Sequence, residues 1–491
     1  MSTNREKKTI SRRQFLFTTG GLIAGATLAA CAPAAPAPAA KPAADAAKPA
    51  AEAPKATEAP KAAEAPKAAA PAPQPTVAVG EYGSGANPTV IWHGLGGADG
   101  AVFAQMLQDY AKKNNTAVRS EQYGWDVFFQ KYPTAVAAGT PPDFAIHHLA
   151  EVPQMAAQGI NQPLDDIFYA ATKIDKSDFG KAIMDVAIID GKTQCVPFDN
   201  HGWNCYVNTK LMEGTGFSAE NMPKNADEFL KYAMKVTVDD AGKHADETGF
   251  NPDKVKVWAL HFSWPRFTMP STWFQYNGGK GGQYDNDTKK AVLDSEKSVA
   301  AVQYWHDLMY KYHVVPPALP GQPGAYEYFK TNSLAIMWDG TWSLGFFKDN
   351  PEIEKITKAV TMNSLSPDGG GGQKIDSHIM AIPTGAKPDQ VDRAVKLIQW
   401  LSDNGKTWAT SGQIPARLSV QKDPAVQAIW SVKAASEAFA KQGHTETPHK
   451  AFIELQTAWE TGVSAALANT APVKDALGAA SKVIQSVLDR G

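Results

Sequence analysis

Hydrophobic and polar residues follow two periodicities in the chain from about residue 87 onward. The stretch "TVIWHG" at 89–94 is short, apolar and β-branched, which predicts a strand. Residues 98–114 carry apolar side chains three and four positions apart, which predicts an amphipathic helix. A strand, a glycine-rich loop and a helix in this order begin an α/β unit. Ligands of such units bind at the carboxyl ends of the strands.

The same alternation continues along the chain. Residues 126–148 predict a helix, a Pro-Pro turn and a strand that ends at His147 and His148. Residues 297–312 and 390–404 are clear amphipathic helices. We therefore expect an α/β module with more helix than strand.

The N-terminus has a different pattern. Basic residues precede an apolar run of about sixteen residues from Phe15, which is the order of a signal peptide and is short for a membrane span. The stretch "SRRQFL", with Arg12 and Arg13, resembles the twin-arginine export motif. "LAAC", ending at Cys31, resembles a lipobox, in which the cysteine is lipidated. We expect an exported lipoprotein with a signal peptide at 1–31; a retained membrane helix is the alternative.

Residues 32–86 are expected to form a disordered tether. The first part is almost wholly Ala, Pro, Lys and Glu, with a six-residue repeat of Glu, Pro and Lys between 52 and 67. Proline at every sixth position interrupts any helix, and there is no large apolar side chain to bury. Such a segment holds a folded module away from a membrane surface.

Composition limits the classes of function. A chain of 491 residues predicts two to four domain-sized units, and a net charge of −2 gives no reason to expect nucleic acid as a partner. Thirteen tryptophans favour recognition of flat or ring-shaped ligands. Besides Cys31 the only cysteines are Cys195 and Cys205, for which a disulfide and two buried thiols are equally acceptable interpretations.

Several motifs from 89 to 490 together resemble one family. They are "WHGLGGADGAVFAQMLQDYAKKN", "AVAAGTPPDFAIHH", "INQPLDDI", "GKTQCVPFDNHGWNCYVNTKLMEGTGF", "YFKTNSLAIMWDGTWSLG" and "SGQIPARLSV". Their order is similar to that of the extracellular solute-binding proteins that serve sugar-importing ABC transporters. Two departures are Asn225-Ala226 in place of Thr-Trp before a helix, and the absence of the usual glycine after Phe329, which affects the turn at 331–333.

The resemblance implies a two-lobed α/β fold of the maltose-binding-protein kind, with a hinge and an interlobe cleft. By the resemblance, lobe 1 is 87–199 plus 373–405, and lobe 2 is 200–372 plus 406–491. The chain is expected to cross between lobes near 198–202, near 371–377 and after the helix that ends near Asn404.

The resemblance also implies that Trp342 lies in the cleft with its ring against a sugar, because sugar C–H groups pack on aromatic faces. For Trp338, cleft and core remain open, and Arg417 could instead brace its own loop. The candidate ligand-binding residues are Trp342, His93, His147, His148, Glu151, Asp199, Asn200, His201, Trp203, Trp264, Trp273, Trp338, Asp339 and Arg417.

The implied function is capture of a mono- or oligosaccharide and its delivery to a membrane permease, outside the cytoplasm and with a lipid anchor. Another polar solute is the alternative, and a surface-anchored carbohydrate-active enzyme or adhesin is a more distant one. "HGLGG" resembles an esterase oxyanion loop, but no G-x-S-x-G follows. We expect no cofactor and no metal. Adjacent His147 and His148 diverge on a strand, and "DND" at 285–287 is better interpreted as a hairpin turn.

Overall fold

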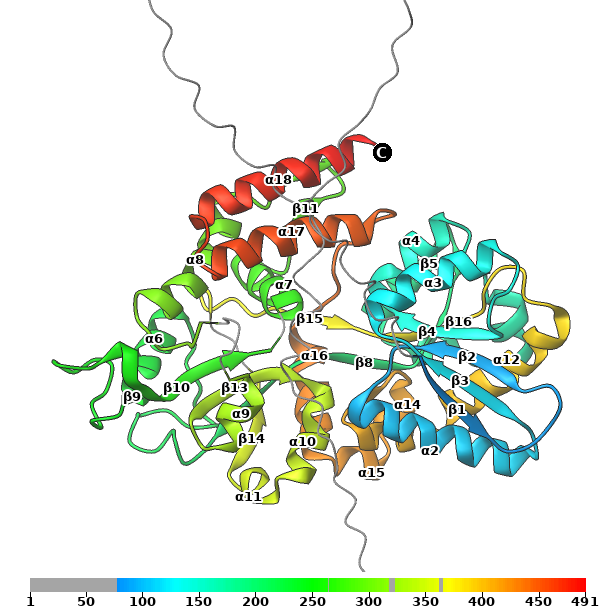
Figure 1. Ribbon diagram of the computed structural model, residues 1–491, viewed down its shortest axis with the longest axis horizontal. Helices are drawn as coiled ribbons and strands as arrows, with labels where there is room; N and C mark the ends of the chain where they lie inside the picture. The colour runs from blue at the N-terminus through cyan, green and yellow to red at the C-terminus, as the bar shows by residue number, and fades with distance from the viewer. Residues whose placement is uncertain (1–76, 264, 318–322, 362–364) are drawn as a thin grey trace, which may run out of the picture. The chain divides into compact units, whose positions relative to one another are not determined.

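The computed structural model describes residues 77–263, 265–317, 323–361 and 365–491 (Figure 1). The predicted signal peptide, Cys31, most of the predicted tether and Trp264 lie outside these residues. Residues 75–491 form one compact unit. No helix in the described ranges combines the length and the apolar character that crossing a bilayer requires.

Strands of the described residues form two main sheets, each with its own hydrophobic core. The first sheet has six strands in the order β1-β3-β2-β4-β16-β7. Their bounds are β1 Ala78–Tyr82, β2 Thr89–His93, β3 Val118–Gln122, β4 Phe144–His148, β7 Val196–Pro197 and β16 His378–Ala381. β2 pairs in parallel with β3 and β4, whereas β16 pairs antiparallel with β4. We call this sheet with its core the first lobe.

The first strand corrects the predicted tether. Residues 78–82 fell within 32–86, yet they form β1 and pair antiparallel with β3 in the register Ala78↔Gln122 to Tyr82↔Val118. The reason is tertiary: β3 would otherwise be an open sheet edge, and Tyr82 packs against the first core. The folded module therefore begins before the residue at which the composition changes.

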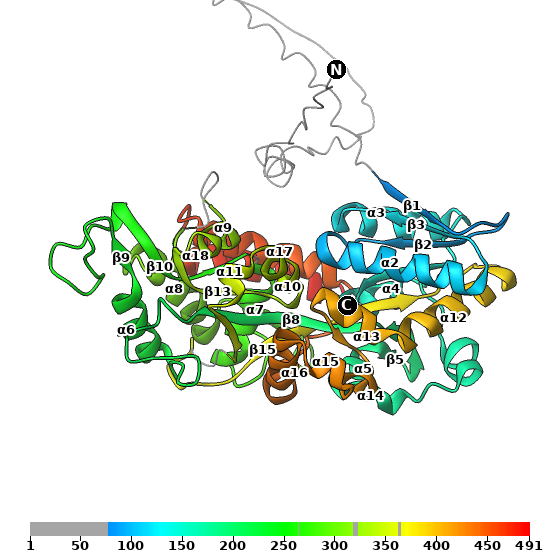
Figure 2. The same ribbon diagram turned by 90° about the horizontal axis from the view of Figure 1, so that it is seen from below.

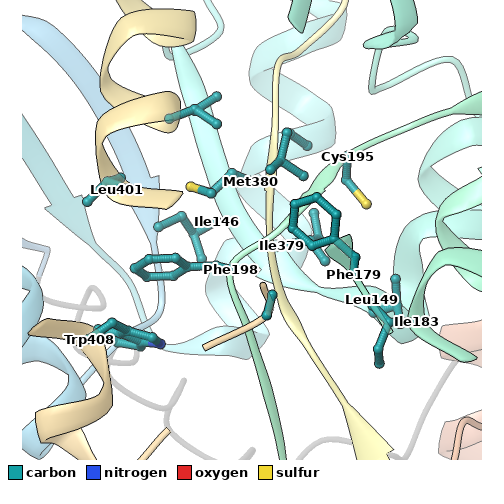
Figure 3. Packing of buried hydrophobic residues seen from close by; sticks show 14 of the residues in the cluster. Ile146, Leu149, Phe179, Ile183, Cys195, Phe198, Ile379, Met380, Leu401 and Trp408 are labelled. Atoms are coloured by element: carbon teal, nitrogen blue, oxygen red, sulfur yellow. The ribbon is translucent and has the colours of Figure 1, made fainter. Parts of the chain in front are cut away.

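Helices surround the first sheet. They are α2 Gly97–Asn114, α3 Trp125–Ala137, α4 Val152–Ala157, α5 Lys181–Ala187, α12 Pro388–Asp403, α13 Gly405–Trp408, α14 Leu418–Gln421 and α15 Pro424–Gln427. Figure 3 shows part of the core, where Phe198 stacks on Trp408 with ring centroids 4.5 Å apart, beside Ile146 and Met380. The predicted strand 89–94 and helix 98–114 are confirmed as β2 and α2.

The second sheet has eight strands, and β8 is at its centre. Six of them follow the order β18-β15-β8-β13-β10-β9. The other two, β14 and β17, each pair with β8. Their bounds are β8 Asp199–Asn208, β9 Val238–Asp239, β10 Val255–Phe262, β13 Leu334–Gly340, β14 Thr357–Val360, β15 Gln373–Asp376, β17 Ile414–Pro415 and β18 Gly443–His444. We call this sheet with its core the second lobe.

Helices also cover the second sheet. They are α6 Ala226–Val236, α7 Pro265–Tyr276, α8 Glu296–Tyr310, α9 Ala325–Lys330, α10 Leu344–Asp349, α11 Pro351–Glu354, α16 Trp430–Gln442, α17 Phe452–Leu467 and α18 Val473–Asp489. α17 and α18 lie side by side in both views (Figures 1 and 2). Two small hairpins, β5 Ile188–Ile189 with β6 Lys192–Thr193 and β11 Tyr284–Asp285 with β12 Lys290–Ala291, lie apart from the main sheets.

Both local departures from the family pattern have a physical solution. Asn225 caps α6, because its side chain accepts a hydrogen bond from the backbone nitrogen of Glu228 at 2.9 Å. In the turn without glycine, Asn332 adopts a φ of +57°, a left-handed conformation that asparagine tolerates better than most residues. The predicted hairpin at 285–287 is confirmed as the β11–β12 turn.

The chain passes from one core to the other at β8 and at the junction of β15 with β16. Phe198 belongs to the first core and Trp203 to the second. Figure 1 shows β8 and β15 running between the sheets, where they pair antiparallel through Ile375↔Gly202 and Asp376↔His201. The first core also continues beyond the predicted lobe boundary at 405, because Trp408, Ile414 and Val426 pack within it.

Candidate functional site

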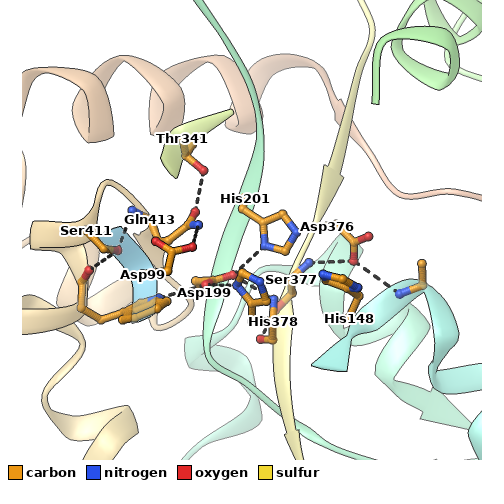
Figure 4. Close-up of polar contacts among 12 residues, drawn as sticks. Asp99, His148, Asp199, His201, Thr341, Asp376, Ser377, His378, Ser411 and Gln413 are labelled. Atoms are coloured by element: carbon orange, nitrogen blue, oxygen red, sulfur yellow. Dashed lines mark hydrogen bonds and ion pairs between the residues drawn. The ribbon is translucent and has the colours of Figure 1, made fainter. Parts of the chain in front are cut away.

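Strand pairing gathers polar side chains where the two sheets meet. His148, the last residue of β4, lies opposite His378, the first residue of β16. His201 of β8 lies opposite Asp376 of β15. We call the buried group His148, Glu151, Asp199, His201, Asp376 and His378 the interlobe cluster. Figure 4 labels all of its members except Glu151. Its members come from segments up to about 230 residues apart, and the sheet register brings them together.

Asp199 organises this cluster through four hydrogen bonds. Its Oδ1 accepts from Nδ1 of His201 and from the backbone nitrogen of His378, both at 2.9 Å. Its Oδ2 accepts from Nδ1 of His378 at 2.7 Å and from the indole nitrogen of Trp408 at 2.9 Å. A buried carboxylate requires such donors to offset its lost hydration. Asp199 therefore fixes the orientation of both imidazole rings.

The charges of these groups depend on one another. Burial favours the neutral form of Asp199, but the adjacent His378 and His201 outweigh it and hold the pKa of that carboxyl below its usual range. Burial likewise opposes protonation of His378, but Asp199 raises its pKa overall. The pKa of His148 falls well below the ordinary value because of burial and of positive charge on Arg266. The cluster thus favours a proton on His378 and a neutral ring at His148.

Several buried polar atoms near the cluster have no hydrogen-bond partner among the described residues. They are His148 Nδ1, Glu151 Oε2, Asn200 Oδ1, Arg266 Nε and Asp376 Oδ2. Glu151, in the short helical turn Leu149–Glu151, lies 3.5 Å from Arg266 of α7 and 3.8 Å from His148. Burial raises the pKa of Glu151. Unpaired buried polar atoms are costly, so their concentration in one place indicates groups that bind something.

Aromatic rings flank the cluster on both sides. Trp342, half-buried in the turn Thr341–Ser343, has its ring centroid 6.2 Å from that of His201 and 5.4 Å from that of Trp203. Its indole lies over Gly340, where a Cβ would come within 2.3 Å of the ring. On the first lobe, the half-buried Trp125 lies 4.2 Å from the ring of His148 and stacks on His378 at 5.9 Å.

The remaining histidine candidates of the first lobe lie at its inner edge. His93 is buried with Nε2 unpaired, and burial together with positive charge on His378 lowers its pKa to about 3. The ring of His147 points away from His148, contacting Nδ2 of Asn161 at 3.2 Å and packing near Tyr132. Adjacent residues of a strand face opposite sides of the sheet, so only His148 reaches the interlobe cluster.

Three predicted candidates lie outside the cluster. Trp273 is fully buried, and its indole donates to the carbonyl oxygen of Ser298 at 3.2 Å. Trp338 is buried in the second core and stacks on Trp305. Arg417 binds Asp178 at 2.8 Å and Asp403 at 2.6 Å, beside a surface cavity of about 640 Å³. These two tryptophans are core residues here, and Arg417 braces the loops around it.

Two other candidates lie on the second lobe near Trp342. Trp203 is fully buried and donates to Thr268 at 2.8 Å, so it supports Trp342 from behind. Asp339 is also buried, and accepts from Ser263 and from the backbone nitrogen of Gly340. Burial raises the pKa of Asp339 to about 6.

A second polar connection joins the lobes through Gln413. Its amide donates to Asp99 of α2 at 2.7 Å and its carbonyl accepts from Thr341 at 2.5 Å (Figure 4). Thr341 immediately precedes Trp342, so this connection links the first lobe to the turn that carries the tryptophan.

The sequence left open whether Cys195 and Cys205 form a disulfide. Both side chains are buried, and neither takes part in a disulfide in the described ranges.

Sequence reasoning missed four residues of this region: His378, Asp376, Trp125 and Arg266. His378 and Asp376 lie in the second crossing segment, and their proximity to His201 follows only from strand register. Trp125 follows β3, a strand that the sequence analysis did not predict, so its place at a carboxyl end was missed with the strand. Nothing in the local sequence distinguishes Arg266 from an ordinary helical arginine.

Comparison with known proteins places this geometry in a family. An arabinooligosaccharide-binding protein of Halalkalibacterium halodurans is 25% identical over 235 residues, which is 47% of this chain and 48% of that protein. A binding protein of Brucella abortus (strain 2308) is 30% identical over 138 residues, 28% of this chain and 32% of that protein. These alignments therefore span from 32% to 48% of the length of the curated relatives.

Solved structures show a similar fold over nearly their whole length. An ABC transporter solute-binding protein from Thermotoga lettingae matches with a TM-score of 0.69 at 20% identity, covering 82% of this chain and 100% of that one. MalE3 of T. maritima matches with a TM-score of 0.68 at 20% identity, covering 82% and 99%. The model of the bacterial extracellular solute-binding protein family matches residues 105–434, so the chain belongs to that family.

Proposed function

We propose that this chain is the substrate-binding component of an ABC importer and captures a carbohydrate between its two lobes. The observation that carries the proposal is the combination of half-buried indole faces, Trp342 and Trp125, with unpaired buried polar atoms between them. Sugars present C–H faces that pack on aromatic rings and hydroxyls that need several placed hydrogen-bond partners.

The names of similar proteins support a sugar. The Halalkalibacterium halodurans relative is named for binding arabinooligosaccharide. The Thermotoga lettingae structure contains α-D-tagatose and the T. maritima MalE3 structure contains maltose. These relatives are binding proteins rather than enzymes, which supports capture without chemical conversion of the sugar.

Closure of the lobes would couple capture to delivery. Trp125 and His148 belong to the first lobe, whereas Trp342 and Arg266 belong to the second. A solute that contacts both sets stabilises the arrangement in which they are close, so binding shifts the population toward that state. The membrane permease would then recognise the closed form.

Export and anchoring complete the proposal. Arg12 and Arg13 would direct export, lipidation of Cys31 would hold the chain at the membrane, and the Ala/Pro-rich segment that follows would act as a spacer. The family is described as extracellular, which fits this location.

The proposal is tested by a thermal-shift screen of the full-length chain against mono- and oligosaccharides, with amino acids and dicarboxylates as the contrasting solutes. A ligand at 100 times its Kd adds about 2.7 kcal/mol of stability and is readily detected. We expect a sugar to raise Tm, to reduce the radius of gyration in small-angle scattering and to be recovered unchanged. If Tm rises only with a solute of another class, that class is the substrate and the sugar proposal is wrong. If the sugar is recovered in a changed form, the protein is an enzyme.

A further inference from the structure

Three histidines of the interlobe cluster converge. His148 and His378 are opposite each other in the β4–β16 pair, and His201 is opposite Asp376, two residues before His378. One ring nitrogen of each histidine lies within 4.8 Å of those of the other two. All three side chains are buried. The pairing of backbone strands, and not the conformation of loops, therefore fixes this arrangement.

Asp199 prepares two of the rings for coordination. Because its carboxylate accepts from Nδ1 of both His201 and His378, each of those nitrogens carries a hydrogen, and Nε2 of each ring is the nitrogen left to bind a cation. A cation at Nε2 of His378 would replace the second proton that Asp199 favours on that ring. No hydrogen bond in the described part of the chain uses Nε2 of either ring. A carboxylate bonded to the far nitrogen of a coordinating histidine is the usual support of protein metal sites.

The third ring has an unexplained donor atom. Nδ1 of His148 is buried and has no hydrogen-bond partner, although Glu151 lies 3.8 Å away. An unpartnered imidazole nitrogen beside two oriented rings is expected where an ion supplies the missing partner. The carboxylates of Asp199 and Asp376 favour a cation at the cluster, whereas Arg266, 3.5 Å from Glu151, opposes one.

We propose that His148, His201 and His378 bind one divalent transition-metal ion of the Zn²⁺ class, with Asp199 as the positioning residue. Three imidazole ligands with an open coordination position are typical of zinc sites that keep water or an exchangeable ligand. Zn–N bonds of about 2.0–2.1 Å require the ring nitrogens to move closer together on binding. The rings of Trp125 and Trp342 lie 4.2 Å from that of His148 and 6.2 Å from that of His201, so a solute held by these tryptophans would lie near the proposed ion.

The test uses the full-length chain without a polyhistidine tag, stripped with EDTA and titrated with Co²⁺ alone. Co²⁺ bound at such a site absorbs visible light, and Zn²⁺ should displace it with loss of that absorption. We expect one Co²⁺ per chain. His201→Gln and His378→Gln should each weaken binding by at least about 10- to 100-fold, which is the loss typical of removing a group that only supports a metal ligand.

His147→Gln is the matched control, because it removes a buried histidine adjacent to His148 whose ring faces the other side of the sheet. It should keep wild-type Co²⁺ affinity. Absence of stoichiometric Co²⁺ binding, or an equal loss in His147→Gln, overturns the proposal. Because the buried variants could unfold, X-ray absorption of the Zn²⁺-loaded wild-type chain provides an independent measurement: three imidazoles support the site, and fewer than three overturn it.

The metal site and sugar binding can fail separately. If a sugar raises Tm in EDTA and the chain binds no Co²⁺, the metal-site proposal is overturned and the carbohydrate proposal stands. Stoichiometric Co²⁺ binding without any sugar response removes the carbohydrate proposal alone.

Discussion

Asp199 holds His378 at two points, accepting from its backbone nitrogen at 2.9 Å and from its Nδ1 at 2.7 Å. The two residues lie 179 positions apart, one at the start of β8 and the other at the start of β16. The chain leaves the first core at the start of β8 and enters it at the start of β16, so the pair joins the two segments on which the lobes would bend. The contact to Nδ1 also orients the imidazole ring of His378.

Replacement of Trp342 separates a binding role from a packing role. Trp342 is half-buried, so Trp342→Ala should lower sugar affinity by roughly 1.5–3 kcal/mol. This is about ten- to a hundredfold. It should change the stability of the unliganded protein little. Calorimetric titration with a sugar from the thermal-shift screen, together with unliganded melting, measures both effects.

Trp338→Ala is the comparison for this prediction, because Trp338 lies four residues earlier and is fully enclosed. It should cost about 3–5 kcal/mol of stability through the cavity that it leaves. If Trp342→Ala destabilises the unliganded chain as much as Trp338→Ala does, Trp342 is a core residue and not a sugar platform.

The crossing strands leave no room for a side chain at Gly202. A Cβ there would lie 2.6 Å from the carbonyl oxygen of Lys374 on β15 and 3.0 Å from the ring of Phe439. Gly202→Ala should therefore separate β8 from β15 and cost about 1–3 kcal/mol. Chemical denaturation measures the change.

The control is Gly478→Ala in α18, where nothing lies within 4 Å of the added Cβ. That change should stabilise the chain by about 0.5–1 kcal/mol, because alanine favours a helix interior. If both substitutions change the free energy of unfolding equally, backbone entropy and not the contact between β8 and β15 determines the effect of Gly202→Ala.

Asp339 predicts a specific pH dependence of stability. Burial raises its pKa from 3.8 to about 6 in the folded state, while Ser263 and Tyr326 donate to it and partly oppose that shift. The folded chain therefore holds this proton more tightly than the unfolded chain. Its stabilising contribution is complete below about pH 4 and is lost as the pH rises through about 6.

Asp339→Asn removes this titration. The stability of the variant relative to the wild type should rise by up to about 3 kcal/mol between pH 4 and pH 7. Denaturation curves at several pH values measure this difference, and the contribution of Asp99, whose pKa burial also raises to about 6, cancels because both proteins contain it. A flat difference would mean that Asp339 is not protonated near pH 5.

Anchoring depends on residues at the N-terminus. Cys31→Ser should release the chain from the membrane fraction without changing sugar affinity, because the lipid would be attached far from the folded module. Replacing Arg12 and Arg13 with lysines should block export through the twin-arginine route. Cell fractionation measures both, and normal export of the lysine variant would instead favour the general secretory route.

The sequence by itself determined the α/β class, many helices and strands, and the order of motifs that matches the family. These are local properties: side-chain periodicity predicts α2 and β2, and Asn225 and Asn332 replace expected residues because each satisfies the same backbone requirement. The strand ending at His147 and His148 was also predictable, since its apolar pattern ends at two polar residues.

Only the tertiary structure decided which candidates meet. His148 joins His201 and His378 because β4, β8, β15 and β16 pair in one particular register, and a register has no local signature in residues some 230 positions apart. The same holds for tryptophan: Trp273 and Trp338 are enclosed while Trp342 is half-exposed, although all three stand in similarly apolar stretches. The burial of a side chain depends on which other segments pack against it. β1 likewise forms because β3, a distant segment, pairs with it.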